Sequence, residues 1–160
     1  WGREPDGHEL ITYTNAITGN AVNGTTSINS NAPADALFIV EQNSPYDWRS
    51  PQSDTLWETA TSANNPCPVG LRVPTLTEQN TLVTAASITN SASAASSTLK
   101  FTVPGFRDHS DGTLGNASFG YYWSSTVSSN VASFRRFNSG GTTSSTNVRA
   151  YGFSVRCLKD

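Results

Sequence analysis

The segment GYYWSSTVSSNVASFRRFNSGGTTSSTNVRAYGFSVRCLKD, residues 120–160, contains two apolar blocks that enclose a run of small polar residues. The blocks are residues 120–127 and 152–158, and most residues between them are Ser, Thr, Asn or Gly. We interpret the blocks as core-building sequence and the run between them as a surface whose composition can change. This arrangement favours a binding module over an enzyme.

The whole chain has the size and composition of a single folded domain, residues 1–160. Its 160 residues are enough for one hydrophobic core. Aromatic residues make up 10% of the chain and include four tryptophans, which is typical of a well-packed fold and not of a disordered chain.

The charge of the chain is low and argues against two classes of partner. Charged residues make up 14% of the sequence, and the formal net charge is -2. Because no basic patch or stripe is visible, we expect neither a nucleic-acid partner nor a polybasic membrane contact. No apolar stretch is long enough to span a bilayer, so we also expect no direct membrane insertion.

The apolar pattern predicts an α+β domain with many short strands and long loops. Residues 87–98 are rich in Ser, Ala and Asn, and we expect them to form a linker. Residues 140–148 allow two interpretations, a flexible loop or two edge strands with a turn. Apolar or alternating runs indicate extended segments at residues 36–41, 71–73, 100–103, 121–125, 132–138 and 151–158.

The best helix candidate begins at Thr75. This residue is suited to the N-cap, and Glu78 follows it at the spacing of a capping box, which satisfies two free backbone amides. The apolar positions recur near a 3.6-residue period and indicate one buried stripe: Leu76, Leu82, Val83 and Ala86. We therefore predict a helix that ends near Ala86.

The two cysteines, Cys67 and Cys157, stand far apart in the sequence, each in a strand-like setting. A disulfide between them would close a loop of about 90 residues and stabilise the fold by about 4 kcal/mol in the chain-entropy model. The alternative is two buried free thiols in a reducing compartment. We favour the disulfide because little Lys and much Ser, Thr and Asn indicate an extracellular protein. Two cysteines with isolated His8 and His109 do not indicate a zinc site.

The predicted strand at residues 132–138 offers a candidate binding surface. Alternate residues of a strand face opposite sides. If Phe137 is a core residue, Arg135 shares its side, and Phe134 lies exposed on the other side with Arg136 and Asn138. An exposed Phe beside an Arg is typical of protein-binding hot spots. The alternative is that Phe134 belongs to the core and Arg135 projects into solvent.

Further candidates for recognition lie around this strand. Residues 140–148 offer hydroxyl and amide groups, although they could also be a solvated connector. Tyr151 stands next to the second apolar block, where an aromatic ring could border a site. The predicted ligand-binding residues are Asn130, Phe134, Arg136, Asn138, Thr143, Ser145, Asn147 and Tyr151.

Cofactor and catalytic motifs are weak in this sequence. Asp108, Asp111 and Asn116 could supply oxygen ligands to Ca²⁺, but their spacing does not match an EF-hand and a hydrogen-bonded turn is the alternative. We expect no other metal or cofactor. The chain has no nucleophile elbow and no phosphate-binding glycine loop, so we do not expect an enzyme.

Five segments carry a resemblance to a known family. They are WGREPDGHE (1–9), SPYDWRSPQSDTLWE (44–58), NPCPVGLRVPTLTE (65–78), GFRDHSDGTLG (105–115) and the framing blocks GYYWSST (120–126) with RAYGFSVRCLKD (149–160). Together they resemble the Fibrobacter succinogenes major paralogous domain, a branch of the C-type lectin-like fold related to the formylglycine-generating enzymes. The resemblance implies a single C-type lectin-like domain. Because the family pattern continues upstream of the WGR tryptophan, it also implies that this chain starts inside the domain.

The tail also resembles the variable proteins of diversity-generating retroelements. In those proteins, adenine errors in Asn-rich codons diversify the segment between YYWSS and RAxGFSVRC without producing Lys, Glu, Gln, Met or Trp. Residues 124–158 contain none of these five residue types. The resemblance implies a ligand-binding domain with a protein or cell-surface ligand, located outside a bacterial cell, on its surface or on a phage particle. The alternative is an undiversified structural or adhesive module, alone or in a larger assembly or filament.

Overall fold

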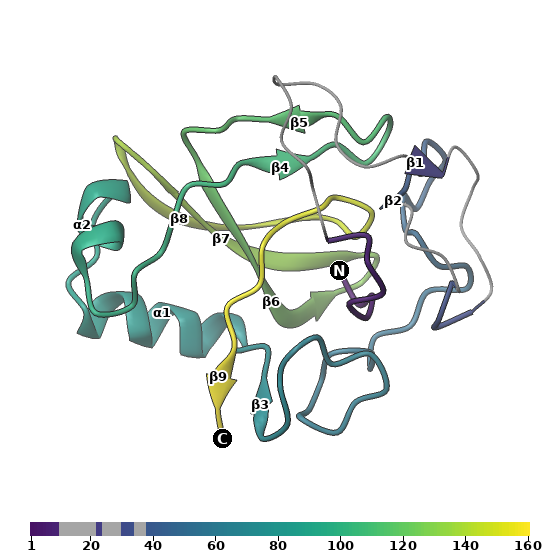
Figure 1. Cartoon of the computed structure of the whole chain (residues 1–160), viewed down its shortest axis with the longest axis horizontal. Helices are drawn as coiled ribbons and strands as arrows, with labels where there is room; N and C mark the ends of the chain where they lie inside the picture. Colours follow the sequence, from purple (N-terminus) through teal and green to yellow (C-terminus); the bar gives the residue numbers. More distant parts are fainter. Residues whose placement is uncertain (10–21, 24–29, 34–37) are drawn as a thin grey trace.

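The computed structural model describes residues 1–9, 22–23, 30–33 and 38–160 (Figure 1). Its regular structure is mostly sheet with two helices, so the predicted α+β class is confirmed. In chain order, the elements are β1 (Val22–Asn23), β2 (Phe38–Ile39), β3 (Leu71–Arg72), α1 (Leu76–Ala85), α2 (Ser91–Ser96), β4 (Phe106–Arg107), β5 (Leu114–Gly115), β6 (Gly120–Ser128), β7 (Val131–Asn138), β8 (Gly141–Val148) and β9 (Leu158–Lys159).

An antiparallel sheet with the strand order β6–β7–β8 forms the centre of the described fold (Figure 1). Two-residue turns connect its strands, at Ser129 and Asn130 and at Ser139 and Gly140. The strands predicted at residues 121–125 and 132–138 are thus confirmed. The segment at residues 140–148 is neither a loop nor two strands, because residues 141–148 form one edge strand paired with β7 along its whole length.

Both sides of β7 are covered, which decides the burial of every residue in it. On one side, which we call the tryptophan side, Phe134 joins a core cluster with Trp123 and Tyr121. On the other, which we call the helix side, Phe137 joins a cluster with Tyr122 and with residues from α1 and α2. β7 is therefore the middle of the fold both within its sheet and between two packed layers.

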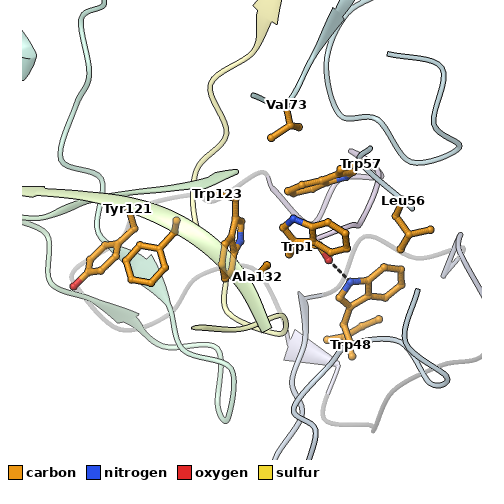
Figure 2. Close-up of a cluster of buried hydrophobic side chains, with 10 residues drawn as sticks. Trp1, Trp48, Leu56, Trp57, Val73, Tyr121, Trp123 and Ala132 are labelled. Atoms are coloured by element: carbon orange, nitrogen blue, oxygen red, sulfur yellow. Dashed lines mark hydrogen bonds between the residues drawn. The ribbon is translucent and has the colours of Figure 1, made fainter. Parts of the chain in front are cut away.

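The tryptophan side is closed by residues that are distant in sequence. Figure 2 shows Trp1, Trp48 and Trp57 gathered beside Trp123. The indole Nε1 of Trp48 donates to the Trp1 carbonyl oxygen at 2.5 Å, and that of Trp1 donates to the Ser124 carbonyl oxygen at 2.8 Å. These bonds satisfy the indole N–H groups of Trp1 and Trp48, whereas the buried Nε1 of Trp57 has no hydrogen-bond partner among the described residues.

α1 begins as the sequence predicts. The Thr75 side chain accepts a hydrogen bond from the Glu78 amide, and the Glu78 carboxylate accepts one from the Thr75 amide, which completes the capping box. The helix ends at Ala85, and the next residue, Ala86, is its C-cap. A bidentate pair from Arg72 to Glu78, at 2.8 and 2.7 Å, connects β3 with the start of this helix.

The expected linker at residues 87–98 is wrong, because this stretch contains α2. Asn90 caps the short helix, and its side chain accepts a hydrogen bond from the Ser93 amide. Ala94 is only 1% exposed, since the helix places it against the helix-side core. A Ser- and Ala-rich segment can pack against a core because its small side chains let the backbone approach closely.

Two predicted extended segments differ from the structure. Residues 100–103 form no strand, because Phe101 packs into the helix-side core and the Thr102 amide donates to the Tyr122 hydroxyl. Of residues 151–158, only Leu158 belongs to a strand, and Gly152 and Ser154 make isolated bridges to Arg107 and Tyr122. The segment predicted at residues 36–41 contains β2, and its residues 36–37 lie outside the described part.

The predicted disulfide between Cys67 and Cys157 is present, with a Cα–Cα distance of 5.8 Å. It joins the loop before β3 to the residue before β9, next to the place where these two strands pair. Both helices of the described residues are too short and too polar to serve as membrane spans.

Candidate ligand-binding face

The strand register brings most of the candidate residues to one side of the sheet. Arg136 stands opposite Thr143, Phe134 opposite Ser145, and Ala132 opposite Asn147. Directly opposite residues of an antiparallel pair project to the same side. The solvent-reaching members of this tryptophan side are called the polar face below: Arg136, Asn138, Thr143, Ser145 and Asn147.

Phe134 does not belong to the exposed surface, and its predicted exposure is wrong. Its side chain is 6% exposed, and its ring centroid lies 5.0 Å from that of Phe153 and 5.8 Å from that of Tyr121. The physical reason is the second covering layer, which makes the tryptophan side of β7 a core surface as well. The alternative, with Phe134 in the core and Arg135 in solvent, is right about Phe134 and wrong about Arg135, which is only 8% exposed on the helix side.

Exposure on the polar face increases from β7 to β8. Arg136 and Asn138 on β7 are half-buried, whereas Thr143 and Ser145 on β8 are exposed. Asn147, at the end of β8 near the loop to Tyr151, is half-buried. The polar face is therefore a strip at the open edge of the sheet, bordered inward by the core.

Arg136 is held in this strip by an aromatic ring. Its Cζ atom lies 5.6 Å from the centroid of the half-buried Phe119 ring. Such a cation–π contact holds the guanidinium above the ring and limits the conformational freedom of the Arg136 side chain. Phe119 in turn stacks on Tyr121, whose Cα stands opposite that of Arg136 in the sheet.

Tyr151 borders the same side of the sheet through a row of rings. It is half-buried, and its ring centroid lies 5.5 Å from Phe153 and 4.8 Å from His109. Tyr46 continues the row at 5.3 Å from His109. Burial, with Asp108 nearby, raises the pKa of the Tyr151 hydroxyl.

Asn130 lies apart from the polar face. It is exposed in the turn between β6 and β7, and its carbonyl oxygen accepts a hydrogen bond from Gln52 Nε2 at 3.2 Å. Sequence reasoning also missed three residues that border the site, Phe119, Tyr46 and His109. Phe119 could have been found, since it stands two residues before Tyr121 in an alternating run. Tyr46 and His109 lie in loops without a periodic signal.

The two carboxylates among the calcium candidates, Asp108 and Asp111, accept hydrogen bonds within their own loop. Asp108 Oδ1 accepts from the Ser110 amide at 2.8 Å, and Asp111 Oδ1 accepts from the Thr113 amide at 2.9 Å. The bonds from Thr113 lower the pKa of Asp111. Neither aspartate belongs to a cluster of three metal-ligating side chains among the described residues. The geometry corresponds to the alternative, a hydrogen-bonded turn.

The described residues do contain one such cluster, Asp6, His8 and Glu9, whose ligand atoms lie within 4.8 Å of one another. Asp6 already pairs with Arg3 at 2.7 Å and with His8 Nδ1 at 2.7 Å. The Arg3 guanidinium opposes a second cation at this place. The cluster borders a cavity of about 330 Å³ that is lined mainly by apolar residues, among them Phe38, Phe106 and Phe153. Among the described residues, no Ser or Cys hydrogen-bonds to His8.

Comparisons with known proteins do not identify this arrangement. No protein-family model matches the chain, and no curated protein or solved structure matches it significantly. The family resemblance of the sequence thus stays a prediction.

Proposed function

We propose that this chain is a ligand-binding domain that displays a variable surface on a C-type lectin-like scaffold, as retroelement-diversified proteins do. Its ligand would be a protein or a cell-surface molecule. The place of action would be outside a bacterial cell, on its surface or on a phage particle. Recognition, and not catalysis, is the activity that we propose.

The pair Phe134 and Ser145 is the observation that carries this proposal. The two residues stand opposite each other on one side of the sheet, yet Phe134 is 6% exposed and Ser145 belongs to the exposed residues. A change of volume at Phe134 disturbs a close-packed core, whereas a change at Ser145 meets solvent. A sheet built in this way can change its ligand without losing its fold.

The surroundings of the polar face support a role in recognition. The half-buried Phe119 ring contacts Arg136 of this face, and the half-buried Tyr151 ring packs on Phe153 on the same side of the sheet. Rings of this kind provide much contact area at low conformational entropy. Small hydroxyl and amide groups on β8 provide adaptable hydrogen bonding next to these rings. The disulfide is compatible with an extracellular location, where such bonds persist.

The proposal is tested in the DNA that surrounds the coding sequence. A diversified protein requires a nearby reverse transcriptase and an imperfect copy of the segment that encodes residues 122–160. The copy should differ mainly at adenines, within the codons of Thr143, Ser145 and Asn147. If both the reverse transcriptase and the copy are absent, diversification is refuted.

A second candidate function is an undiversified structural or adhesive module, and one observation favours it. β8 is an edge strand that contains no charged residue and no proline and pairs with β7 without a register shift. Natural proteins commonly protect such edges with charges, prolines or bulges. Sedimentation over a range of concentrations tests this function, because an assembling module should associate and a Thr146→Lys variant should not.

A further inference from the structure

The charges of this chain are unevenly distributed along its sequence. Residues 112–159, which contain all of the central sheet, include no Asp and no Glu. The same residues include five basic side chains: Arg135, Arg136, Arg149, Arg156 and Lys159. The formal net charge of the whole chain is nevertheless -2, so its carboxylates are concentrated in other parts. The part of the sequence that contains the central sheet therefore carries a net positive charge, although the chain as a whole is acidic.

Arg149 and Arg135 have partners within the fold. The guanidinium of Arg149 is fully buried and lies 2.6 Å from the Asp54 carboxylate. Arg135 donates to the Asn80 side-chain oxygen and, at 3.2 Å, to the Thr142 hydroxyl. Both arginines thus hold parts of the scaffold together.

Arg136 differs from these two arginines. Its guanidinium makes no ion pair and no hydrogen bond with any residue that the structure describes, and its recorded contact is the Phe119 ring. Because the ring restrains one side of this half-buried group, the N–H donors are preorganised for a group that approaches from solvent.

The immediate neighbours of Arg136 on the polar face add donors and no acid. Thr143 stands directly opposite and contributes a hydroxyl group. Asn138 follows two positions later on the same side, and its Oδ1 accepts a hydrogen bond from the Gly140 amide at 2.9 Å. The amide NH₂ of Asn138 is thereby left as a donor. Three side chains with donor groups thus occupy neighbouring positions on one side of the sheet, and no carboxylate of the described residues pairs with Arg136.

We propose that Arg136, Asn138 and Thr143 form a seat for a carboxylate, and that the ligand of the polar face is an acidic protein segment. A carboxylate matches the guanidinium with two parallel hydrogen bonds and accepts further bonds from a hydroxyl or an amide. This inference depends on the proposed function and specifies the chemistry of its partner. A nucleic acid fits less well, because binding a phosphate backbone requires several free cations, and the polar face offers one.

The experiment selects peptides from a displayed library of randomised twelve-residue sequences on the immobilised 160-residue chain. We expect the selected peptides to be enriched in Asp and Glu relative to the starting library. For the best peptides, R136Q should weaken binding about tenfold or more, because it removes a charge-assisted hydrogen-bonded pair. R136K should restore part of the affinity, since Lys keeps the charge and loses the bidentate geometry.

Arg156 provides the matched control. Arg156 is exposed, and its guanidinium lies over the ring of Phe101, which belongs to the helix-side core. R156Q therefore removes the same charge as R136Q, but away from the polar face. This variant should bind the selected peptides as the wild type does. An equal loss with R156Q and R136Q would refute a specific seat and leave only general charge attraction.

The remaining outcomes separate this inference from the proposed function. Selected peptides without acidic enrichment, or with affinity unchanged by R136Q, would overturn the carboxylate seat and leave a recognition surface in place. Failure to select any peptide would count against the seat and the recognition function together. A single-stranded twenty-nucleotide oligonucleotide, tested in parallel, should not bind; binding that R136Q abolishes would replace the acidic protein with a nucleic acid.

Discussion

β7 and β8 are neighbouring strands of equal length in one sheet, and they differ in how deeply their side chains are buried. Of the eight residues in β7, five are buried and none is exposed. In β8, four consecutive residues, 143–146, are exposed and none is buried. The central strand is covered on both sides, whereas the edge strand meets the rest of the described fold mainly through β7. Stability and surface composition are therefore controlled by adjacent residues that stand opposite each other.

This difference shows how a protein can separate folding from recognition over a few ångströms. Close packing makes the core sensitive to a single methylene group, and exposed positions with few neighbours are insensitive to it. The separation requires no flexible loop, because a hydrogen-bonded strand can hold variable side chains in a fixed arrangement.

Phe134→Ala should lower the free energy of unfolding by about 4 kcal/mol, because it leaves a cavity among the rings of Trp123, Tyr121 and Phe153. The facing substitution Ser145→Ala should change it by less than about 0.5 kcal/mol. Urea denaturation monitored by tryptophan fluorescence measures both. Similar losses for the two variants would contradict the contrast between the strands.

Arg135 and Arg136 provide a second comparison, between two sides of one strand. Arg135→Ala should cost about 2 kcal/mol, because it removes a buried stem and its hydrogen bonds to Asn80 and Thr142. Arg136→Ala should cost at most about 1 kcal/mol, the value of an exposed cation–π contact. The same denaturation experiment ranks the two variants, and the reverse order would show that the sides are assigned wrongly.

Acid should weaken the scaffold at the connection between β3 and α1. The hydrogen bonds from Arg72 lower the pKa of Glu78 to about 2, from 4.5 in the unfolded chain. The pair therefore contributes its stability above pH 4.5 and loses it as the pH falls from 4.5 toward 2. We expect the pair to contribute about 1 kcal/mol or less to the free energy of unfolding, since solvent screens this partly exposed pair.

Thermal unfolding of the wild type and Glu78→Gln between pH 7 and pH 2 measures this contribution. The difference in stability between the two proteins should shrink over the window from pH 4.5 to 2. A constant difference would mean that the ion pair adds nothing. Binding at β8 should be unaffected by the variant at pH 7, because Glu78 lies in α1 and away from the polar face.

The smallest effects belong to the edge strand itself. Thr143→Tyr and Ser145→Asp should each change the free energy of unfolding by no more than about 0.5 kcal/mol, because both side chains are exposed. Circular dichroism should show unchanged secondary structure. A loss above about 1 kcal/mol for either variant would mean that β8 is part of the scaffold and cannot be diversified freely.

Local sequence signals predicted several parts of this fold well. The capping box at Thr75 and Glu78 predicts the start of α1, since the two residues interact within one helical turn. The apolar run at residues 121–125 and the alternating run at 132–138 indicate strands through their own composition. For α2, the Asn90 cap and the Ser93 side chain were available as signals, but the six-residue helix has no apolar period to reveal it.

The sequence by itself determined the helix start and the strands β6 and β7, because these follow from neighbouring residues, and it favoured the pairing of Cys67 with Cys157 over two free thiols. It also placed Arg136, Asn138 and Phe134 on a common side of one strand, since alternation is a local property. Only the tertiary structure decided which of these residues meet solvent. Phe134 is buried because Phe153, from the segment after the sheet, packs against it together with Tyr121 and Trp123, and no local pattern in β7 predicts these contacts.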